Sequence, residues 1–440
     1  MNTKFIAGFS KLSKEEKIRI VSDELLDSTG FSSDLKSLNH VLPEKQLLLE
    51  QFSENTLGNF PLPFGVAPNF LINKRNYIVP MVTEESSVVA SASAAARFWA
   101  EKGGFHAKVK DCLKTGQIHF CWHGNSKILI DSKKDLFKYL LKNGLTLTQR
   151  MIERGGGVRG IELIDMSDKL ENYFQLKIGF ATADSMGANF MNSVLEDMAS
   201  LLKEYYNGSE SNDSTNNPVE IIMAILSNYT PDCVVECYVE TRFSSFDGIY
   251  EDMTGEEFAR KFKKAVDIAH LDPYRAVTHN KGIFNGIDAV VMATANDFRA
   301  VEAAGHAYAA RSGQYCSLSK VNISEDLFKL SLEIPIAVGT VGGLTSLHPI
   351  AKWSFEILKR PAIHELMMII AATGLASNFA AIKSLITRGI QEGHMKMHLG
   401  NILTTLVCTE SERHSAIEYF SNKKVSFHEV EKFIKKKRKS

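Results

Sequence analysis

An alternation of apolar and amphipathic segments between residues 117 and 226 constrains the fold most strongly. The pattern predicts a strand at 117–122, a helix at 133–142, strands at 161–165 and 173–181, a helix at 185–206, and a strand or helix at 219–226. Strand–helix–strand–strand–helix–strand is the order of the split βαβ unit of ferredoxin-like domains. The polar segment 207–218 lacks apolar periodicity and is typical of a surface loop or hinge. We therefore expect a small inserted domain over residues 110–218.

The flanking residues, 1–109 and 219–376, are expected to form one larger domain. Two of its predicted helices, at 86–100 and 297–311, are unusually rich in small side chains. Small side chains let helix axes approach closely, which predicts buried central helices. From about residue 377 the chain becomes amphipathic and basic, so 377–440 are expected to form a small helical C-terminal element. The predicted fold class is α+β.

Composition indicates an ordinary soluble globular protein. The 440 residues are 44% hydrophobic, with 51 acidic and 51 basic side chains, so no overall field favours nucleic acid or an anionic membrane. The basic ending at 434–439 is the exception. It is interpreted as a solvated, mobile tail, with contact to an anionic ligand as the alternative. The six cysteines show no zinc-binding spacing, which favours a reduced, cytoplasmic protein.

Neither a signal peptide nor a membrane span is predicted. The N-terminal sequence is charged and has no apolar core of signal-peptide length. The most apolar run, at 366–376, is shorter than the roughly 20 residues that cross a bilayer.

A lysine and an aspartate flank a short apolar stretch between residues 281 and 299. The stretch at 287–293 has the pattern of a buried strand, and Asp297 stands at a predicted helix start. An ammonium and a carboxylate at the two ends of one buried element can polarise a carbonyl and manage its proton. The structural alternatives are a surface lysine in a loop and a helix-capping aspartate.

Two carboxylates, Glu84 and Glu85, lie between the apolar stretch 77–82 and the small-sided helix that follows. Acidic residues in a first helical turn are favoured by the helix dipole, which is the structural interpretation. The functional alternative is a buried carboxyl that retains and transfers a proton.

Residues 184–189 form a candidate phosphate-binding site. Asp184 precedes a predicted helix with Gly187 in its first turn, and a helix N-terminus accepts phosphate oxygens. Asp184 is equally interpretable as the helix cap. The glycines at 155–157, between Arg154 and Arg159, are interpreted either as a second phosphate-binding loop or as an ordinary turn. No G-x-G-x-x-G follows a strand, so a Rossmann fold has no support.

His394 and His398 are four residues apart, a spacing that presents both rings on one helix face. Zinc would need a third ligand, and the glutamate of H-E-x-x-H is absent. The sequence therefore favours a catalytic or packed histidine over a metal site.

Taken together, eight segments closely resemble the class II 3-hydroxy-3-methylglutaryl-coenzyme A reductases, the soluble form of bacteria and archaea. In chain order the segments are ENTLG at 54–58, LPFGVAPNF at 62–70, VPMVTEESSVVA at 79–90, DSMGAN at 184–189, HNKG at 279–282, ATANDFRAVEA at 293–303, GTVGG at 339–343 and GHMKMH at 393–398.

The resemblance implies a small, non-Rossmann, ferredoxin-like domain for NADH or NADPH and a large domain for the acyl-CoA. It implies a homodimer with active sites completed at the subunit interface, which could be part of a larger assembly, and a C-terminal flap that carries the catalytic histidine. Neither metal, nucleic acid nor membrane is expected as a partner. The reaction would interconvert 3-hydroxy-3-methylglutaryl-CoA and mevalonate plus CoA by two hydride transfers, through a hemithioacetal and mevaldehyde.

The motifs carry the family's residue roles onto this chain. The expected catalytic residues are Glu85, Lys281, Asp297 and His394; the expected substrate contacts are Ser87, Arg275 and Asn285; the expected cofactor contacts are Asp184, Met186, Gly187 and Asn189. Two small residues depart from the pattern: Ala295 replaces a glycine and Ser185 an alanine, with little expected effect.

Two other functions fit the residues less well. A non-redox acyl-CoA hydrolase or lyase could use the same glutamate, lysine and histidine without a nicotinamide. A catalytically silent scaffold could keep the small-sided helices alone. The sequence decides neither between NADH and NADPH nor between mevalonate synthesis and breakdown.

Overall fold

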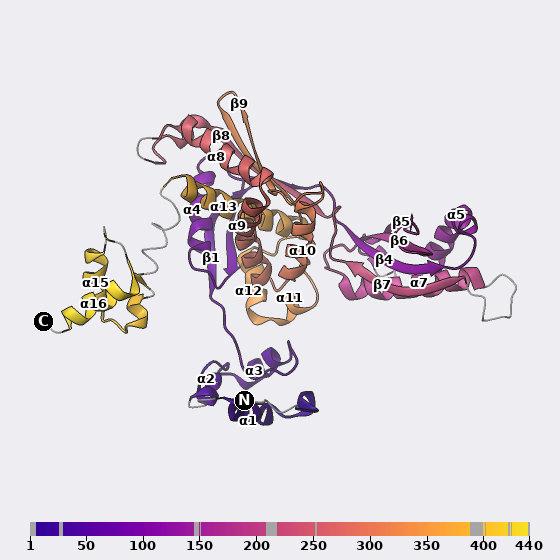
Figure 1. Ribbon diagram of the computed structural model, residues 1–440, viewed down its shortest axis with the longest axis horizontal. Helices are drawn as coiled ribbons and strands as arrows, with labels where there is room; N and C mark the ends of the chain where they lie inside the picture. The colour runs from indigo at the N-terminus through magenta and orange to yellow at the C-terminus, as the bar shows by residue number, and fades with distance from the viewer. Residues whose placement is uncertain are drawn as a thin grey trace. The chain divides into compact units, whose positions relative to one another are not determined.

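The computed structural model describes residues 6–25, 30–144, 149, 151–207, 218–250, 253–387, 399–400, 402–420, 423 and 425–438 (Figure 1). The chain divides into two compact units, Met1–Pro63 and Phe64–Ser440. This division falls inside the segment 1–109 that the sequence assigns to the large domain.

The first unit is built from short helices: η1 (Phe9–Lys11), α1 (Lys14–Glu24), α2 (Phe31–Ser37) and α3 (Pro43–Glu50). Helix α1 begins with a capping box, in which Ser13 and Glu16 each bond the other's backbone N–H. Pro43 occupies the first turn of α3, where a missing N–H costs nothing.

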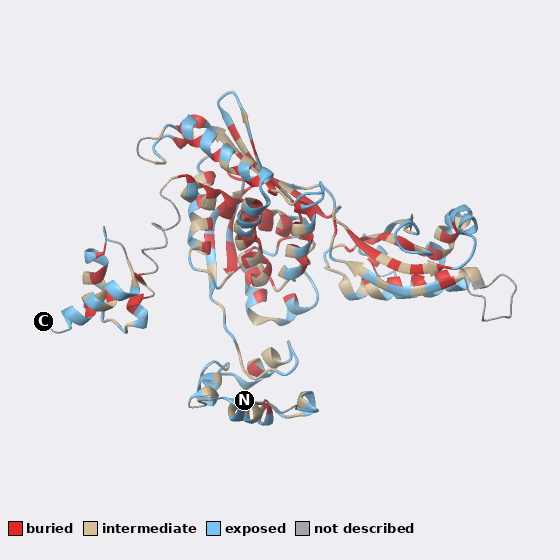
Figure 2. Cartoon of the chain, viewed as in Figure 1, coloured by how far each residue is buried: buried red, intermediate tan, exposed pale blue. Residues whose placement is uncertain are grey.

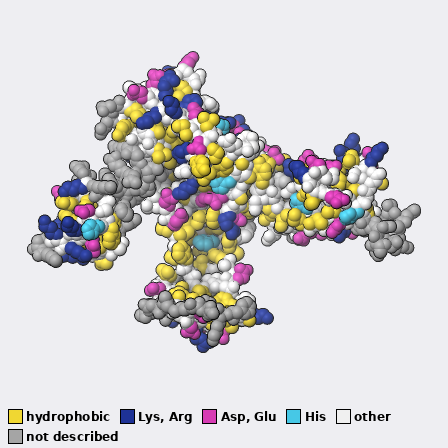
Figure 3. Space-filling view, in the orientation of Figure 1, with side chains coloured by type: hydrophobic (Ala, Val, Ile, Leu, Met, Phe, Trp, Pro, Cys, Tyr) yellow, Lys and Arg dark blue, Asp and Glu magenta, His cyan; other side chains and the backbone are white. Residues whose placement is uncertain are grey.

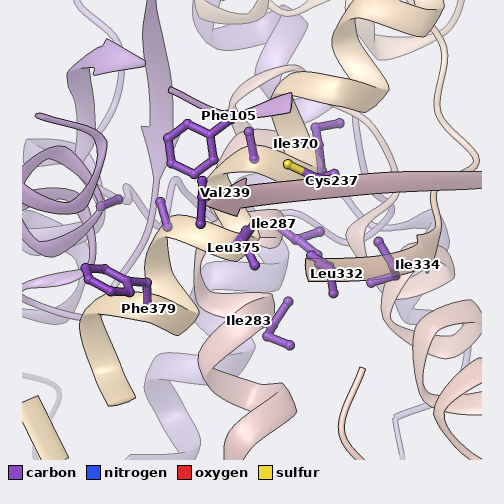
Figure 4. Packing of buried hydrophobic residues seen from close by; sticks show 14 of the residues in the cluster. Phe105, Cys237, Val239, Ile283, Ile287, Leu332, Ile334, Ile370, Leu375 and Phe379 are labelled. Atoms are coloured by element: carbon purple, nitrogen blue, oxygen red, sulfur yellow. The ribbon is translucent and has the colours of Figure 1, made fainter. Parts of the chain in front are cut away.

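The second unit is organised around a four-stranded antiparallel sheet with the order β3-β8-β10-β9. Its strands are β3 (His106–Val109), β8 (Val234–Arg242), β9 (Ser319–Ser324) and β10 (Leu327–Pro335). Buried and more exposed residues alternate along β8 and β10, as expected for strands with one face in the core. Figure 4 shows Val239 and Leu332 of this sheet close to Ile287 and Leu375.

Two helices, α9 (Pro273–Ala293) and α13 (Ile363–Ile386), contribute these last residues and pack directly against each other. A Cβ atom at Gly286 would lie 2.5 Å from the Thr373 carbonyl oxygen, and one at Gly374 would lie 2.7 Å from Ile287. Glycine is therefore needed for the close approach of the two helix backbones.

The remaining elements of this core surround these two helices. They are the hairpin β1 (Phe64–Ile72) and β2 (Arg75–Val82), then α4 (Val88–Ala100), η2 (Phe243–Phe246), α8 (Gly255–Leu271), α10 (Phe298–Ala309), α11 (Leu344–Leu347) and α12 (Pro349–Ile357). Helix α4 packs on β1 and α13, and α8 packs on α9. The predicted small-sided helices are thus present as α4 and α10, with buried alanines in both.

The strand predicted at 287–293 is wrong, because these residues form the last turns of α9. Ile283, Ile287, Val290 and Val291 are all buried against the surrounding core. A helix that is apolar on most faces loses the 3.6-residue pattern of a half-exposed helix, so its sequence is indistinguishable from a buried strand.

A second four-stranded antiparallel sheet has the order β5-β6-β4-β7. Its strands and helices follow one another as β4 (Leu113–Trp122), α5 (Ser126–Asn143), β5 (Gly157–Asp165), β6 (Tyr173–Ala181), α7 (Ala188–Asn207) and β7 (Val219–Ser227). Helices α5 and α7 contact each other and cover one face, over a separate buried core that Figure 2 shows as a red stripe along the strands. The predicted element order is therefore present, and 219–226 is a strand.

Helix α13 is the only described helix long and apolar enough to cross a membrane by length and composition. However, 78% of its most apolar window is buried inside the protein, as in the core helix of a globular domain. The run at 366–376 is thus part of a longer apolar helix than its sequence indicated.

Near the C-terminus, α15 (Glu410–Tyr419) and α16 (Phe427–Lys437) enclose a small apolar cluster of their own. The predicted mobile tail is helical up to Lys437: Ile434 is buried, and Arg438 donates to Glu412 at 2.8 Å. Figure 3 shows acidic and basic side chains interspersed over most of the visible face, in line with the balanced composition.

Candidate active site

Helix α9 presents a polar face to a pocket of about 460 Å³. The helix is capped by Asp272, whose side chain accepts a hydrogen bond from the Tyr274 N–H. Thr278, Lys281 and Asn285 are separated by three and four residues, which places them on one face of the helix. All three line the pocket, together with Arg275 from the first turn.

The opposite wall of the pocket comes from the link between β2 and α4. Ser87 precedes α4 with a φ of 77°, a left-handed conformation that is uncommon for a residue with a side chain. The Glu85 N–H donates to Thr83 Oγ1 at 3.1 Å, which fixes the turn. This tight turn directs Glu85 and Ser87 into the pocket.

Lys281 donates a hydrogen bond to the Glu85 carboxylate across the pocket. The lysine side chain is 58% exposed and the glutamate side chain 39% exposed. An ion pair so open to water adds little stability, so its presence is not explained by folding alone.

The structure therefore brings five of the sequence-predicted residues into one pocket: Glu85, Ser87, Arg275, Lys281 and Asn285. Ser377 and Asn378 of α13, with the buried His279, add to the polar lining and were not predicted. Their positions depend on the crossing of α9 and α13, which no local pattern reveals.

His279 is held in a buried network beneath the pocket. Its Nε2 lies 2.6 Å from Ser319 Oγ, which donates to Asn378 Oδ1 at 2.9 Å. Burial, reinforced by the charge of Arg275, lowers the pKa of His279 to about 3. The ring is therefore neutral at physiological pH and orders the pocket floor without acting as an acid.

Asp297 does not join this pocket. Its carboxylate caps α10 by accepting from the Ala300 N–H, and it lies 3.5 Å from Arg299 Nε. Ala293, the last residue of α9, comes twelve positions after Lys281, about 18 Å along the axis at 1.5 Å per residue. Within one chain, Asp297 therefore lies beyond the C-terminal end of α9, far from the level of Lys281.

A different carboxyl group, that of Asp288, lies on α9 between Lys281 and the end of the helix and was not predicted. Burial and the neighbouring carboxylates of Glu302 and Glu84 raise its pKa to about 9. A protonated Asp288 is thus the form expected at neutral pH.

The second candidate site surrounds residues 184–189. Asp184 lines a pocket of about 610 Å³ with Arg154, Arg159 and Lys114. Lys114 is buried and donates to Thr182 Oγ1 and to the carbonyls of Ser185 and Met186, at 2.7 to 2.9 Å. Three cationic side chains in one pocket suit an anionic ligand.

The interpretation of Asp184 as a helix cap is wrong. Helix α7 begins at Ala188, and the Met191 N–H bonds the Gly187 carbonyl. Gly187 has a φ of 77°, and a Cβ there would lie 2.7 Å from Thr182. The turn before the helix packs instead on the 339–343 loop, where Thr340 N–H donates to the Asp184 carbonyl.

Of the other cofactor residues, Met186 is half-buried beside Lys114, and Asn189 is exposed in the first turn of α7. His394 and His398 lie outside the described residues. Within the described ranges, no group of three or more His, Cys, Asp or Glu side chains could hold a metal ion.

Comparison with known proteins adds an independent line of evidence. A profile of the family described as hydroxymethylglutaryl-coenzyme A reductase matches residues 15–399. The chain is 34% identical over 421 residues to the 3-hydroxy-3-methylglutaryl-coenzyme A reductase of Archaeoglobus fulgidus, covering 94% of this chain and 90% of that protein. It is 32% identical over 414 residues to the probable reductase of Borreliella burgdorferi, covering 92% and 90%.

Among solved structures, the chain is similar to the class II 3-hydroxy-3-methylglutaryl-CoA reductase from Streptococcus pneumoniae bound to NADPH. The TM-score is 0.71 and the identity 34%, over 87% of this chain and 99% of the other.

Proposed function

Because this chain belongs to the hydroxymethylglutaryl-coenzyme A reductase family, we propose that the Glu85–Lys281 pocket is its catalytic site and the Asp184 pocket its cofactor site. The chain is an oxidoreductase that acts on a coenzyme A thioester with a nicotinamide cofactor. The reaction interconverts 3-hydroxy-3-methylglutaryl-CoA and mevalonate plus CoA. The observation that carries the assignment is the solvent-open Glu85–Lys281 pair facing Arg275, Ser87 and Asn285.

Lys281 is suited to stabilise an oxyanion. Reduction of a thioester to an alcohol places negative charge on the same oxygen twice, first on the way to the hemithioacetal and then from the aldehyde. A nicotinamide cofactor, when bound, supplies the hydride for each step. An ammonium fixed at that oxygen in a closed, dry pocket contributes about 3–4 kcal/mol to the barrier reduction.

Glu85 is suited to manage the proton of that oxygen. It already shares a hydrogen bond with Lys281, so a carbonyl oxygen that enters between them meets a cation and a carboxyl together. Substrate that displaces water from the pair strengthens both interactions. Arg275 offers a guanidinium on the same side for the substrate's terminal carboxylate.

His394 is proposed to protonate the departing CoA thiolate from a C-terminal flap. Imidazole titrates near neutral pH, which suits this transfer. Without protonation, the thiolate could attack the aldehyde again. The proposal rests on the family motif GHMKMH at 393–398.

The Asp184 pocket fits a dinucleotide in several respects. Arg154, Arg159 and Lys114 supply positive charge for phosphate oxygens, and Asp184 can accept from a ribose hydroxyl. A Cβ atom at Gly339 would lie 2.5 Å from the backbone nitrogen of Met186, so the 339–343 loop packs directly on the turn that follows Asp184. The observed sheet order β5-β6-β4-β7 supports an inserted ferredoxin-like domain. Its last strand, β7 (Val219–Ser227), lies past the predicted domain end at residue 218, in the range assigned to the large domain.

A homodimer with interfacial active sites is the proposed assembly. In its own chain Asp297 stands at the start of α10, after the end of α9, and is absent from the lining of the Lys281 pocket. A second copy could bring its own Asp297 to the open side of the pocket. The expected cellular location is the cytoplasm.

Absorbance at 340 nm tests the function directly. Enzyme, 3-hydroxy-3-methylglutaryl-CoA and NADPH or NADH are mixed, and cofactor oxidation is compared with thiol release. A reductase oxidises two cofactors per thiol released, and initial rates with each cofactor give its preference. Thiol release without cofactor oxidation would establish the hydrolase or lyase instead.

Lys281→Ala then tests the site. Loss of the oxyanion-stabilising ammonium should lower kcat about 10²- to 10³-fold, for the thioester and for free mevaldehyde alike. Lys264→Ala is the matched control, because Lys264 is an exposed lysine on α8 outside the pocket. Unchanged mevaldehyde reduction by Lys281→Ala would refute the assigned role.

A further inference from the structure

Two cysteines face each other in the wall of the Asp184 pocket, just beyond the end of strand β3. The Lys110 N–H donates to the Val234 carbonyl, and the Val234 N–H donates to the Asp111 carbonyl. Lys110 and Asp111 therefore both pair with Val234, as in a β-bulge. The next residue, Cys112, consequently lies opposite Cys233. Residues opposed in an antiparallel pair have Cα atoms about 4.5–5.5 Å apart, within the range that a disulfide spans.

The two thiols are also near enough for each to shift the pKa of the other. The Cys112 sulfur lies 3.5 Å from Met367 Sδ. Cys112 is half-buried at the pocket surface, whereas Cys233 is 1% exposed, with its sulfur 3.4 Å from the Ile336 carbonyl oxygen. A reagent in the pocket can therefore reach Cys112 directly but Cys233 only through Cys112.

The surroundings of Cys112 favour its thiolate. The neighbouring Cys233 thiol, followed by the charge and hydrogen bond of His364 and the charge of Lys114, lowers the pKa of Cys112 to about 6, although burial acts against them. Asp111 is the opposing charge nearby; it accepts from the Cys112 N–H at 2.7 Å. The neighbouring Cys112 sulfur, together with burial, raises the pKa of Cys233, so that its thiol keeps its proton.

By contrast, Cys237 on β8 is fully buried in the large core, and burial raises the pKa of its thiol. A thiol of this kind is inert toward disulfides, since the thiolate is the nucleophile. The reactive arrangement thus belongs to the pocket and is not a general property of the cysteines in this sheet.

We propose that Cys112 and Cys233 form a reversible thiol–disulfide site that reshapes the Asp184 pocket. The co-reactant is a low-molecular-weight disulfide, RSSR. The Cys112 thiolate attacks one sulfur, forming a protein–SR bond and releasing RS⁻. Cys233 then loses its proton, attacks the Cys112 sulfur and expels the second RS⁻. One RSSR is reduced to two thiols as the protein dithiol is oxidised to the disulfide, and excess thiol reverses both steps.

Formation of this bond would alter the pocket because both cysteines and Asp184 line the same cavity of about 610 Å³. The Cys112 side chain turns away from the pocket toward Cys233, and it no longer presents a negative charge to Lys114 and His364. This part of the proposal rests on the proposed function, because NADPH serves as the probe of the pocket.

The bond is tested by peptide mapping of the full-length protein. Reduced protein is incubated with oxidised glutathione, alkylated and digested without reductant. Wild type should lose two of its six thiols and yield one Cys112–Cys233 peptide. Cys233→Ser should stop at a glutathione adduct on Cys112, and Cys112→Ser should leave Cys233 free.

Cys121→Ser is the matched control, a half-buried cysteine on β4 that should react as wild type does. A wild-type protein that carries glutathione on Cys112 while Cys233 remains free would overturn the proposal. So would a disulfide joining any other pair of cysteines. Both outcomes are measured on the wild type, so neither depends on how well a variant folds.

The effect on the pocket is tested by fluorescence titration of NADPH with reduced and oxidised wild type. We expect the dissociation constant to rise severalfold on oxidation and to return with dithiothreitol. Equal constants in the two states would overturn the coupling to the pocket. Absence of NADPH binding to the reduced protein would count against the proposed function, and the peptide map would still decide the disulfide.

Discussion

At the scale of single residues, Asp288 shows how a group outside the reaction can set the pH range of the fold. Its carboxyl group is largely buried and lies near the carboxylates of Glu302 and Glu84. Burial and these two neighbours raise its pKa from 3.8 to about 9. A carboxyl that binds its proton more tightly when folded contributes stability that is complete below its unfolded pKa. That stability is lost as the pH rises through the folded pKa.

Asp288→Asn should therefore flatten the pH dependence of stability. Wild type should lose stability as the pH rises from about 4 toward about 9, whereas the amide cannot ionise. Urea unfolding of both proteins at about pH 5 and about pH 8 measures the difference, with Asp267→Asn at a half-exposed position of α8 as control. Parallel changes in all three proteins would show that Asp288 is not the responsible group.

At the scale of elements, the crossing of α9 and α13 holds the proposed catalytic lysine in place. The backbones meet at Gly286, where a Cβ atom would lie 2.5 Å from both the carbonyl oxygen of Thr373 and the hydroxyl oxygen of Ser377. Because the Thr373 oxygen belongs to the backbone, a side chain at position 286 must push two core helices apart.

Gly286→Ala should consequently destabilise the protein by about 1–3 kcal/mol, the usual cost of overpacking a core. Gly282→Ala on the same helix is the control, because its nearest neighbour, Ala381 Cβ, is 3.8 Å away. With room for a methyl group, that variant should gain up to about 1 kcal/mol from helix propensity. Urea midpoints measure both variants, and an equal loss of stability in the two would refute the packing explanation.

These elements also show what the sequence could predict. The periodicities of α5 and α7 and the alternation of β6 revealed the small sheet's element order, because in each element a buried face alternates with a less buried one. The pattern failed at 287–293, where the helix is buried on most sides. The pairing of Glu85 with Lys281 came from family motifs, since no local pattern specifies a contact across 196 positions of sequence.

At the scale of the whole molecule, a single chain places the proposed catalytic groups at two separate points. Glu85 and Lys281 share one pocket, whereas Asp297 lies beyond the far end of α9. Lys281 and Asp297 are only sixteen positions apart in the sequence. Most of those positions form a helix, which rises 1.5 Å per residue, so closeness in sequence does not place the two side chains in one pocket. Because Asp297 is absent from the lining of this pocket in its own chain, we propose that it acts from a partner subunit.

Mixed dimers test this arrangement. Lys281→Ala and Asp297→Asn homodimers should each have strongly reduced activity, but their heterodimer should contain one site with both groups intact. Random pairing of co-expressed subunits makes half of the dimers mixed, with one of two sites active, so about a quarter of wild-type activity should return. The control pairs Lys281→Ala with Glu85→Gln, whose residues meet within one chain, and it should recover nothing. Purified Lys281→Ala/Asp297→Asn heterodimers without activity would place Asp297 outside the partner's site, since the folded subunits would then offer every group that the interface requires.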